Sequence, residues 1–134
     1  MEVKLLDFTE FVDKRGHLLP LEANKNIPFK IKRLYFIYST NKKMSRGFHA
    51  HKKLMQVAIC ITGYCTIVLD DGQVRKEIGL NSPKKGLLID KMIWREMKDF
   101  SKNCVLMVIA DDYYDESDYN RDYGNYLEML KWLK

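Results

Sequence analysis

The sequence is poor in the residues that mark several classes of protein. It has only three cysteines, an odd number, and only three prolines and seven glycines among 134 residues. Because Cys60, Cys65 and Cys104 lie in apolar, strand-like segments, we expect buried reduced thiols and no disulfide framework. Cys60 and Cys65 also lack the CxxC spacing of many zinc sites. The composition, 46% hydrophobic and 31% charged, excludes a disordered or low-complexity chain.

Long apolar runs are also missing. No window approaches the roughly 20 apolar residues that a membrane-spanning helix requires. The first residues, MEVKLLDFTEF, contain acidic side chains and no apolar run long enough for a signal peptide. We therefore expect a soluble, cytoplasmic protein with no membrane partner. No linker or internal repeat is visible, so residues 1–134 are predicted to form a single domain.

The net charge of +5 is moderate, and the Lys and Arg residues are scattered along the chain. A basic stripe interleaved with exposed aromatic residues, typical of nucleic-acid binding, is not visible. We therefore expect no nucleic-acid partner. The charge fits an anionic small ligand at least as well, and plain solubility remains an alternative explanation.

Most of the chain has the pattern of short strands joined by turns, which predicts an all-β sandwich or barrel. Asp71-Gly72 lies between two alternating runs and is a strong hairpin signal. The predicted strand regions are 30–38, 54–63, the hairpin at 64–80, 86–94 and 103–111.

The tail has a different pattern. From Asp118 onwards apolar residues recur at roughly helical spacing, which predicts a short C-terminal amphipathic helix, although Gly124 weakens it. The residues of this pattern are Tyr123, Tyr126, Leu127, Leu130 and Leu133.

The stretch RGFHAHKKLMQVAICITG, residues 46–63, places two of the three histidines one residue apart. On a strand, His49 and His51 point to the same face, so their imidazoles are predicted to lie side by side. The spacing from His49 through His51 and Gln56 to Gly63 resembles the first motif of the cupin superfamily, which normally has glutamate in place of Gln56. The simplest alternative is that both histidines are solvated in a loop.

Two further ligands of a metal-binding cupin are missing. Gln56 supplies a neutral amide in place of a carboxylate, and the later segment GLLIDKMIWREM has Trp94 and no histidine. The remaining histidine, His17, lies far upstream and is more typical of a loop residue. Two imidazoles and an amide suit a divalent ion poorly. We therefore expect no metal, and two tunable imidazoles suit acid–base chemistry instead.

Longer segments resemble the sugar 3,4-ketoisomerases that act on dTDP-4-dehydro-6-deoxyglucose, the WxcM-like, FdtA/QdtA-type family. The segments that carry the resemblance span nearly the whole chain in the expected order: DKRGHLLPLEANKNIPFKIKRLYFIY, RGFHAHKKLMQ, LDDG, LNSPKKGLLI, MIWREMKDFSKNCVLMVIA and YYDESDYNRDY. The resemblance implies a cupin-type jelly-roll β-barrel that needs no metal or other cofactor. It also implies a homodimer, with N-terminal strands at the subunit interface.

The resemblance also implies a substrate and a product. The substrate is a dTDP-linked 4-keto-6-deoxy sugar, and the product is its 3-keto isomer. An aminotransferase then makes a 3-amino sugar for surface polysaccharide or S-layer glycan. The configuration of the product at C4 depends on which face receives the proton, and the sequence does not specify it.

Moving a ketone from C4 to C3 requires removal of the C3 proton and delivery of a proton to C4. Imidazoles near neutrality suit both steps, so His49 and His51 are predicted to divide them, with His49 favoured as the base at C3. Arg46, Tyr35 and Gln56 are candidate donors to the developing oxyanion. Each has a simpler explanation: Arg46 could shape the turn, Tyr35 could be a core aromatic, and Gln56 could hold a histidine tautomer.

Substrate-binding candidates follow from the two phosphates and the base of the ligand. Arginine suits phosphates, and Arg33 shares a face with Tyr35 by strand alternation. Alternation turns only one of Trp94 and Arg95 inward. The remaining candidates are Arg15 and Lys53 for the phosphates, and Tyr38 or Trp94 as a platform for the thymine.

Two other functions stay open. A dTDP-sugar 3,5-epimerase also removes a proton next to a C4 ketone, so residues alone separate it poorly from a ketoisomerase. A non-catalytic cupin that binds a sugar is the alternative from a different class.

Overall fold

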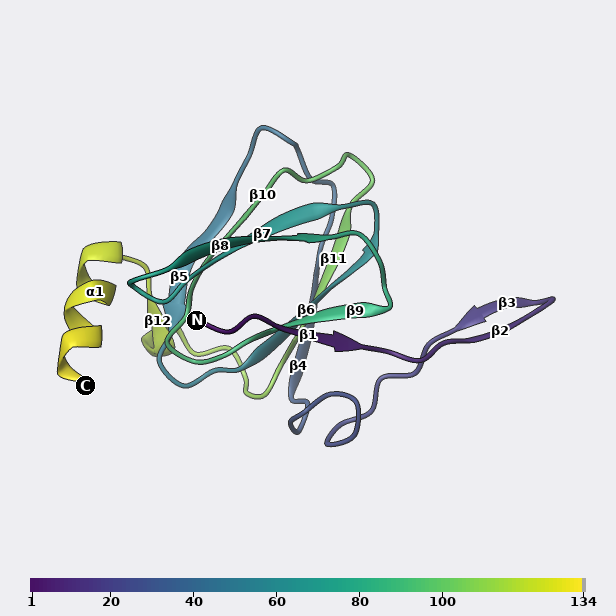
Figure 1. Cartoon of the computed structure of the whole chain (residues 1–134), viewed down its shortest axis with the longest axis horizontal. Coiled ribbons are helices and arrows are strands. Elements are labelled where there is room, and N and C mark those ends of the chain that lie inside the picture. The colour runs from purple at the N-terminus through teal and green to yellow at the C-terminus, as the bar shows by residue number, and fades with distance from the viewer. Residues whose placement is uncertain (134) are drawn as a thin grey trace.

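The computed structural model describes residues 1–133, and its strands form two five-stranded antiparallel sheets that face each other (Figure 1). The first sheet has, in order, β1 (Lys4–Asp7), β9 (Lys85–Ile89), β6 (Gln56–Thr62), β11 (Val105–Ala110) and β4 (Arg33–Ile37). The second has β12 (Tyr119–Asn120), β5 (Arg46–His51), β10 (Trp94–Lys98), β7 (Cys65–Asp70) and β8 (Arg75–Leu80).

This arrangement confirms the mostly-β fold with one short C-terminal helix. Within residues 1–133 the hydrogen-bonded strands stay in separate sheets and do not close into a barrel. The Asp71-Gly72 hairpin is confirmed, because β7 and β8 pair from Cys65↔Leu80 to Asp70↔Arg75 around that turn. Gly72 has φ +94°, a conformation that favours glycine.

The core lies between the two sheets, and strand alternation decides which side chains enter it. On β4, Ile37 is buried, whereas Leu34 and Phe36 are exposed on the outer face. The largest cluster of buried residues combines both sheets: Ile37, Ala58, Cys60, Cys65, Ile67, Leu69, Leu80, Leu87, Ile89, Met97, Phe100, Cys104, Leu106 and Val108.

The three cysteines are buried and free, as predicted. Their Sγ atoms all lie within 4.8 Å of one another, a proximity that the sequence spacing did not indicate. Burial raises the pKa of Cys104 to about 11. The hydrogen bond to Cys60, and next burial, raise the pKa of Cys65. Since the thiols lie in an apolar cluster, we assign them to core packing.

The segment 86–94 differs from its prediction as one strand. Strand β9 ends at Ile89, and β10 begins at Trp94 after a turn in which Met92 has φ +62°. Residues 90–93 form this turn, and the last residue of the predicted segment, Trp94, begins a strand of the second sheet.

The helix α1 (Tyr123–Trp132) confirms the C-terminal prediction. The Asp122 side chain caps its first turn by accepting a hydrogen bond from the Asn125 backbone N–H. Tyr126 is fully buried, and its ring packs against Trp94 with a centroid distance of 5.7 Å. No helix in residues 1–133 is long and apolar enough to cross a membrane.

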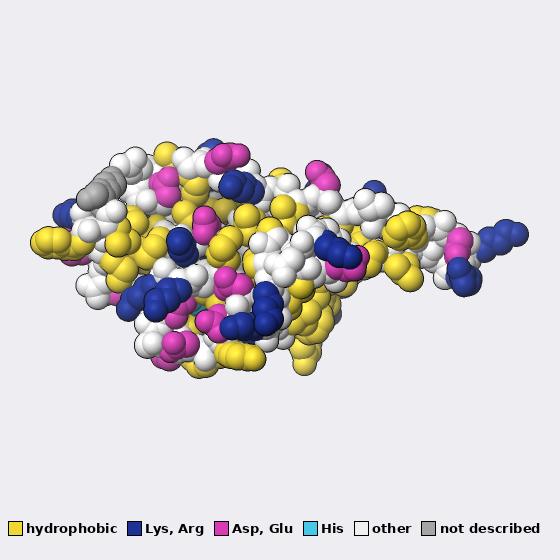
Figure 2. Space-filling model, turned by 90° about the horizontal axis from the view of Figure 1, so that it is seen from below, with side chains coloured by type: hydrophobic (Ala, Val, Ile, Leu, Met, Phe, Trp, Pro, Cys, Tyr) yellow, Lys and Arg dark blue, Asp and Glu magenta, His cyan; other side chains and the backbone are white. Residues whose placement is uncertain are grey.

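The strands β2 (Phe11–Asp13) and β3 (Gly16–Leu18) pair only with each other and project from the body as an arm (Figure 1). We call residues 11–18 the arm. Phe11, Val12 and Leu18 are 62%, 59% and 62% exposed, so the arm leaves apolar side chains uncovered. Figure 2 shows hydrophobic side chains along the arm and cationic side chains at its tip.

Candidate active site

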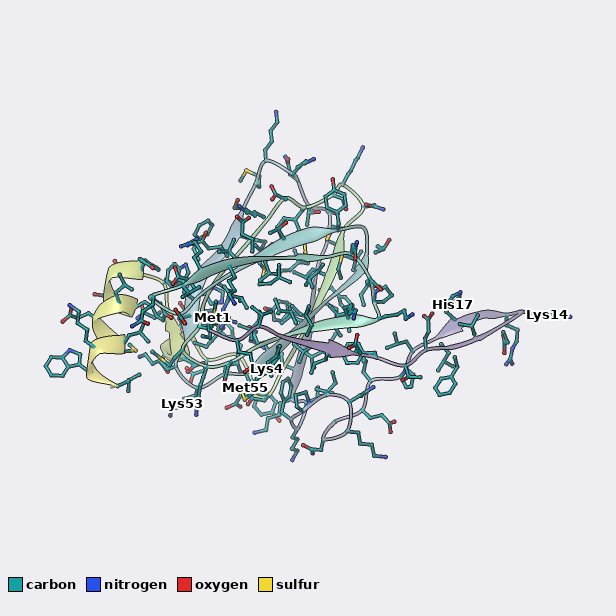
Figure 3. The ribbon with its side chains drawn as sticks, viewed as in Figure 1. Met1, Lys4, Lys14, His17, Lys53 and Met55 are labelled. Atoms are coloured by element: carbon teal, nitrogen blue, oxygen red, sulfur yellow. The ribbon has the colours of Figure 1, made fainter. Side chains whose placement is uncertain are left out.

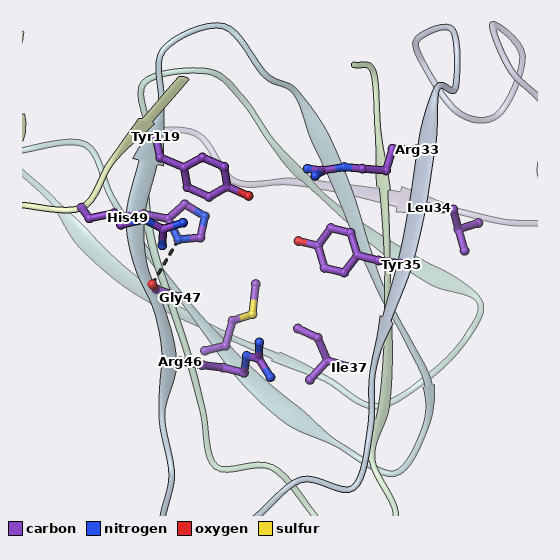
Figure 4. A pocket seen from close by; sticks show the side chains of 10 residues that line it. Arg33, Leu34, Tyr35, Ile37, Arg46, Gly47, His49 and Tyr119 are labelled. Carbon is purple, nitrogen blue, oxygen red and sulfur yellow. Dashed lines mark hydrogen bonds between the residues drawn. The ribbon is translucent and has the colours of Figure 1, made fainter. Parts of the chain in front are cut away.

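A cavity of about 420 Å³ opens between β4 of one sheet and β5 of the other (Figure 4). Both polar and apolar residues border it: Arg33, Leu34, Tyr35, Ile37, Arg46, Gly47, His49, Met97, Tyr119 and Arg121. The Leu34 side chain itself points away from the cavity (Figure 4). The polar groups project from opposite walls, and Ile37 and Met97 belong to the core beneath.

A local irregularity in β5 shapes one wall. Gly47 has φ +93° and Phe48 has φ +55°, and the pairing of β5 with β10 shifts register between Arg95 and Glu96. A Cβ on Gly47 would lie 3.2 Å from both the Arg95 carbonyl oxygen and the Glu96 Cα. The glycine therefore permits a close backbone approach at the point where the wall bends.

The two imidazoles lie side by side, as predicted from their spacing. The ring centroids of His49 and His51 are 4.9 Å apart, and the planes meet at 86°. His49 lines the cavity, whereas His51 is only 1% exposed and lies behind it. The cavity therefore reaches one of the two rings directly.

The hydrogen bond of His49 fixes the tautomer of its neutral ring. Its Nδ1 lies 3.0 Å from the Gly47 carbonyl oxygen, which can only accept, so Nδ1 donates and Nε2 keeps a lone pair. Burial, and next the charge of Arg95, lower the pKa of His49 to about 4. The ring is therefore neutral near pH 7, and its Nε2 lone pair is free to accept a proton.

His51 is also neutral. Its Nδ1 lies 3.1 Å from Oδ2 of Asp118, which on its own favours the charged ring. Burial and the charge of Arg95 act in the opposite direction and outweigh it, lowering the pKa of His51 to about 2.

The facing wall carries a phenol and a guanidinium. The Arg33 guanidinium lies 5.4 Å from the ring centroid of Tyr35, and both side chains project into the cavity (Figure 4). The Tyr35 hydroxyl accepts a hydrogen bond from Gln56 Nε2 at 3.3 Å. Burial raises the pKa of Tyr35, so its hydroxyl stays protonated and can donate a proton.

A buried cation lies beneath this arrangement. Arg95 is 0% exposed, and it donates to the Gln56 side-chain oxygen and, at 3.0 Å, to the Ile93 carbonyl. Within residues 1–133 no carboxylate makes an ion pair with it, and its Nε has no partner. Burial lowers the pKa of Arg95 to about 10, so it remains charged.

This donor set does not fit a divalent ion. Both ends of the Gln56 amide are engaged, by Arg95 and by Tyr35, and its oxygen is neutral, so the amide is a poor ligand for a metal beside the histidines. The guanidinium of Arg95 also places a positive charge below the imidazoles, which disfavours a second cation.

Three residues of the C-terminal segment complete the site. Strand β12 pairs with β5 through Tyr119↔His51, and the Tyr119 ring centroid lies 4.8 Å from His49 and 4.3 Å from His51. The guanidinium carbon of Arg121 lies over the Tyr119 ring, 4.2 Å from the ring centroid. Sequence reasoning missed Asp118, Tyr119 and Arg121, although they belong to the segment YYDESDYNRDY that carries part of the family resemblance.

Residues 1–131 match the family described as FdtA: WxcM-like, C-terminal. The chain belongs to this family. A curated relative from Aneurinibacillus thermoaerophilus, TDP-4-oxo-6-deoxy-alpha-D-glucose-3,4-oxoisomerase, is 53% identical over 130 residues. The match covers 97% of this chain and 94% of that relative.

Solved structures agree with this placement. A 3,4-ketoisomerase from Helicobacter canadensis is 50% identical, with a TM-score of 0.95 and 98% of both chains covered. QdtA, a sugar 3,4-ketoisomerase from Thermoanaerobacterium thermosaccharolyticum solved with TDP, is 47% identical with a TM-score of 0.95, covering 98% of this chain and 96% of that chain. A mutant of QdtA was solved with TDP-4-keto-6-deoxyglucose; this match has 47% identity and a TM-score of 0.94 and covers 97% and 94% of the two chains. The resemblance to sugar 3,4-ketoisomerases is thus confirmed.

The cavity of this ketoisomerase brings together only some of the predicted residues. Arg33, Tyr35, Arg46 and His49 line it. Gln56 and Arg95 lie below them, both almost fully buried. Of the pair Trp94 and Arg95, alternation turns Arg95 toward the histidines and Trp94 toward α1.

Other candidates lie elsewhere in this chain. Tyr38 is 67% exposed and does not line the cavity. It is three residues after Tyr35, which points inward, so strand alternation turns Tyr38 outward. Arg15 lies at the tip of the arm, paired with Asp13, and its side chain is 90% exposed. Figure 3 shows the neighbouring Lys14 and His17 on the arm, distant from the body, and Lys53 on the body itself; Lys53 does not border the cavity.

Proposed function

We propose that this ketoisomerase converts TDP-4-keto-6-deoxyglucose into its 3-keto isomer by proton transfer at the cavity between β4 and β5. The observation that carries the proposal is a neutral imidazole, His49, facing a protonated phenol, Tyr35, across one cavity. The relatives named above, one of them solved with TDP-4-keto-6-deoxyglucose, support this substrate class.

The first half of the reaction forms an enediol. Nε2 of His49 takes the C3 proton, which the neighbouring C4 carbonyl makes acidic, and the electron pair of the C3–H bond becomes the C3–C4 double bond. The C4 oxygen takes a proton from the Tyr35 hydroxyl. The buried charge of Arg95 stabilises the negative charge that develops between these steps.

The second half reverses the roles at the neighbouring carbon. The Tyr35 phenolate takes the proton of the C3 hydroxyl, the C3 carbonyl forms, and C4 receives the proton held by His49. No atom is gained or lost. His51, which the cavity does not reach, acts through the His49 ring against which it packs.

Three guanidinium groups favour an anionic ligand. Arg33, Arg46 and Arg121 line the cavity, and we propose that they hold the diphosphate. The Tyr119 ring offers an aromatic face in the same cavity.

The 3-keto product is suited to transamination, so we place the reaction before an aminotransferase that makes a 3-amino sugar for a surface glycan. Residues 1–134 are proposed to act as one domain.

The decisive experiment incubates the protein with TDP-4-keto-6-deoxyglucose and follows the sugar carbons by NMR. We expect the ketone carbon signal to move from C4 to C3. A retained 4-ketone with inverted C3 or C5 would instead establish an epimerase. Binding of TDP without any turnover would establish a non-catalytic sugar-binding protein.

We also propose that the chain forms a homodimer through the arm. Burial of an apolar side chain stabilises a protein by about 1.5–3 kcal/mol. In a single chain the side chains of Phe11, Val12 and Leu18 stay exposed and do not contribute this stabilisation. An arm laid on a second chain would cover these side chains and bring Arg15 to the partner.

Sedimentation velocity tests this assembly. The wild type is expected to sediment as a dimer and Phe11→Asp as a monomer, because the charge opposes burial of the arm. Val74→Asp, at an exposed apolar position on the β7–β8 hairpin, is the matched control and should stay dimeric. A monomeric wild type, or a dimer unaffected by Phe11→Asp, would contradict the proposal.

A further inference from the structure

Asp118 does not line the cavity, yet it is bonded to the histidine pair and to the backbone beside it. Its Oδ2 lies 3.1 Å from Nδ1 of His51, and its Oδ1 accepts a hydrogen bond of 2.8 Å from the backbone N–H of Lys53. Its main-chain oxygen accepts a further hydrogen bond of 3.0 Å from the backbone N–H of Lys52. The carboxylate is therefore held in one orientation, and its side chain is only 14% exposed.

We infer that Asp118 is the positioning residue of the histidine pair: it holds the proton of His51 on Nδ1 and leaves the lone pair on Nε2. A carboxylate can only accept, so a neutral His51 in this geometry must donate from Nδ1. The effect of Asp118 on turnover rests on the proposed function, whereas its effect on the His51 tautomer does not.

The surroundings of the other ring nitrogen favour the same tautomer. Nε2 of His51 is buried and has no hydrogen-bond partner in residues 1–133. The positive charges of Arg95, Arg33 and Arg121 all act on this ring. A lone pair at Nε2 is compatible with that field, whereas an N–H there would point a positive end at cations without gaining an acceptor.

The chain around Asp118 is built to keep the carboxylate in place. The single 3₁₀ turn η1 (Glu116–Asp118) begins at Asp115, whose side chain accepts from the Ser117 backbone N–H. The chain then enters β12, where Tyr119 pairs with His51 and covers both imidazole rings. Asp118 and Tyr119 thus fix the protonation and the packing of the pair from one short segment.

The variant Asp118→Asn tests the inference because an amide can keep one hydrogen bond and must reverse the other. Its side-chain oxygen can still accept from the Lys53 N–H, and its NH₂ group then donates to Nδ1 of His51. The ring must carry its proton on Nε2 instead. We expect the ¹⁵N NMR shifts of His51 to report Nδ1–H in the wild type and Nε2–H in the variant, in both cases without substrate.

Turnover provides the second readout. We expect kcat of Asp118→Asn to fall on the order of 10²-fold, as when a histidine is held in the wrong tautomer, while KM changes little. Asp111→Asn is the matched control, because Asp111 also accepts from a backbone N–H, that of Met55 at 3.1 Å, but contacts neither histidine. Its kcat and the His51 shifts should remain those of the wild type.

The outcomes separate this inference from the proposed function. Nε2–H in wild-type His51, Nδ1–H in Asp118→Asn, or an unchanged kcat in a variant with a reversed tautomer would overturn the positioning role. The wild-type tautomer remains decisive if the variant fails to fold. A wild type that does not isomerise the sugar would overturn the proposed function, and the tautomer shifts would still test Asp118.

Discussion

Replacing His49 by asparagine is expected to lower the turnover of TDP-4-keto-6-deoxyglucose by about 10²–10⁴-fold, the usual contribution of a positioned general base. The amide is similar in reach to the imidazole but cannot accept a proton from carbon. His49 is the imidazole that lines the cavity, and its Nε2 carries the lone pair because Nδ1 donates to Gly47. Coupled NMR assays of the substrate and product sugars measure the loss.

Two measurements show whether the loss belongs to the chemical step. TDP affinity by calorimetry should change little, because the arginines at Arg33, Arg46 and Arg121 remain in the cavity. Exchange of the C3 proton with solvent deuterium should fall together with isomerisation, since both need the same base. Exchange at the wild-type rate in His49→Asn would show that another group removes the C3 proton.

The strand pattern was sufficient to predict much of this site. Alternation along 30–38 placed Arg33 and Tyr35 on one face, and both line the cavity. The same alternation places Tyr38 on the opposite face of the strand. Tyr38 was a candidate platform for the thymine only because it is aromatic, although the alternation already argued against it. The two imidazoles lie together as their spacing indicated, although β5 is bent by Gly47 and Phe48 in a way that period-two alternation does not describe.

The remaining part of the site could not be predicted from the periodicity of the sequence. Strand β12 has two residues, too few to show a period, and only its pairing with β5 brings Tyr119 onto the histidines. The break at Met92, a non-glycine residue with positive φ, follows Asp90-Lys91, a polar pair without the glycine or proline that marks a turn most strongly. The exposed arm was not predicted from the sequence, because its strands of three residues are as short as ordinary turns.

Replacing Arg95 by methionine is expected to lower kcat and, at the same time, to leave thermal stability unchanged or increased. The guanidinium is fully buried without a carboxylate partner, and desolvating such a charge costs several kcal/mol. Losing its hydrogen bonds to Gln56 and to the Ile93 carbonyl offsets part of this gain, at about 1–3 kcal/mol for each acceptor left without a partner. In turnover the charge stabilises the enediolate, so its loss should lower kcat by about 10²–10³-fold.

The pH dependence of the variant follows from the cause of the low pKa of His49. The ring acts as a base only when neutral, so wild-type kcat/KM should fall on acidification as the pH approaches the His49 pKa of about 4. Burial is the larger cause of that low pKa and the charge of Arg95 is the second. Arg95→Met should therefore raise the pH at which kcat/KM falls on acidification, which we call the acidic limb. The rise should cover only part of the difference between about 4 and the ordinary pKa of histidine. Calorimetric melting and pH–rate profiles measure both effects.

Arg75→Met is the matched control for this substitution, because Arg75 is half-exposed, pairs with Glu96 and Asp70, and is not among the charges that lower the pKa of His49. Its acidic limb should coincide with that of the wild type. If Arg95→Met melted several degrees lower and kept both kcat and the acidic limb, Arg95 would be a structural residue. A more stable enzyme that has lost turnover would instead show that the fold tolerates an unpaired buried cation because the reaction uses its charge.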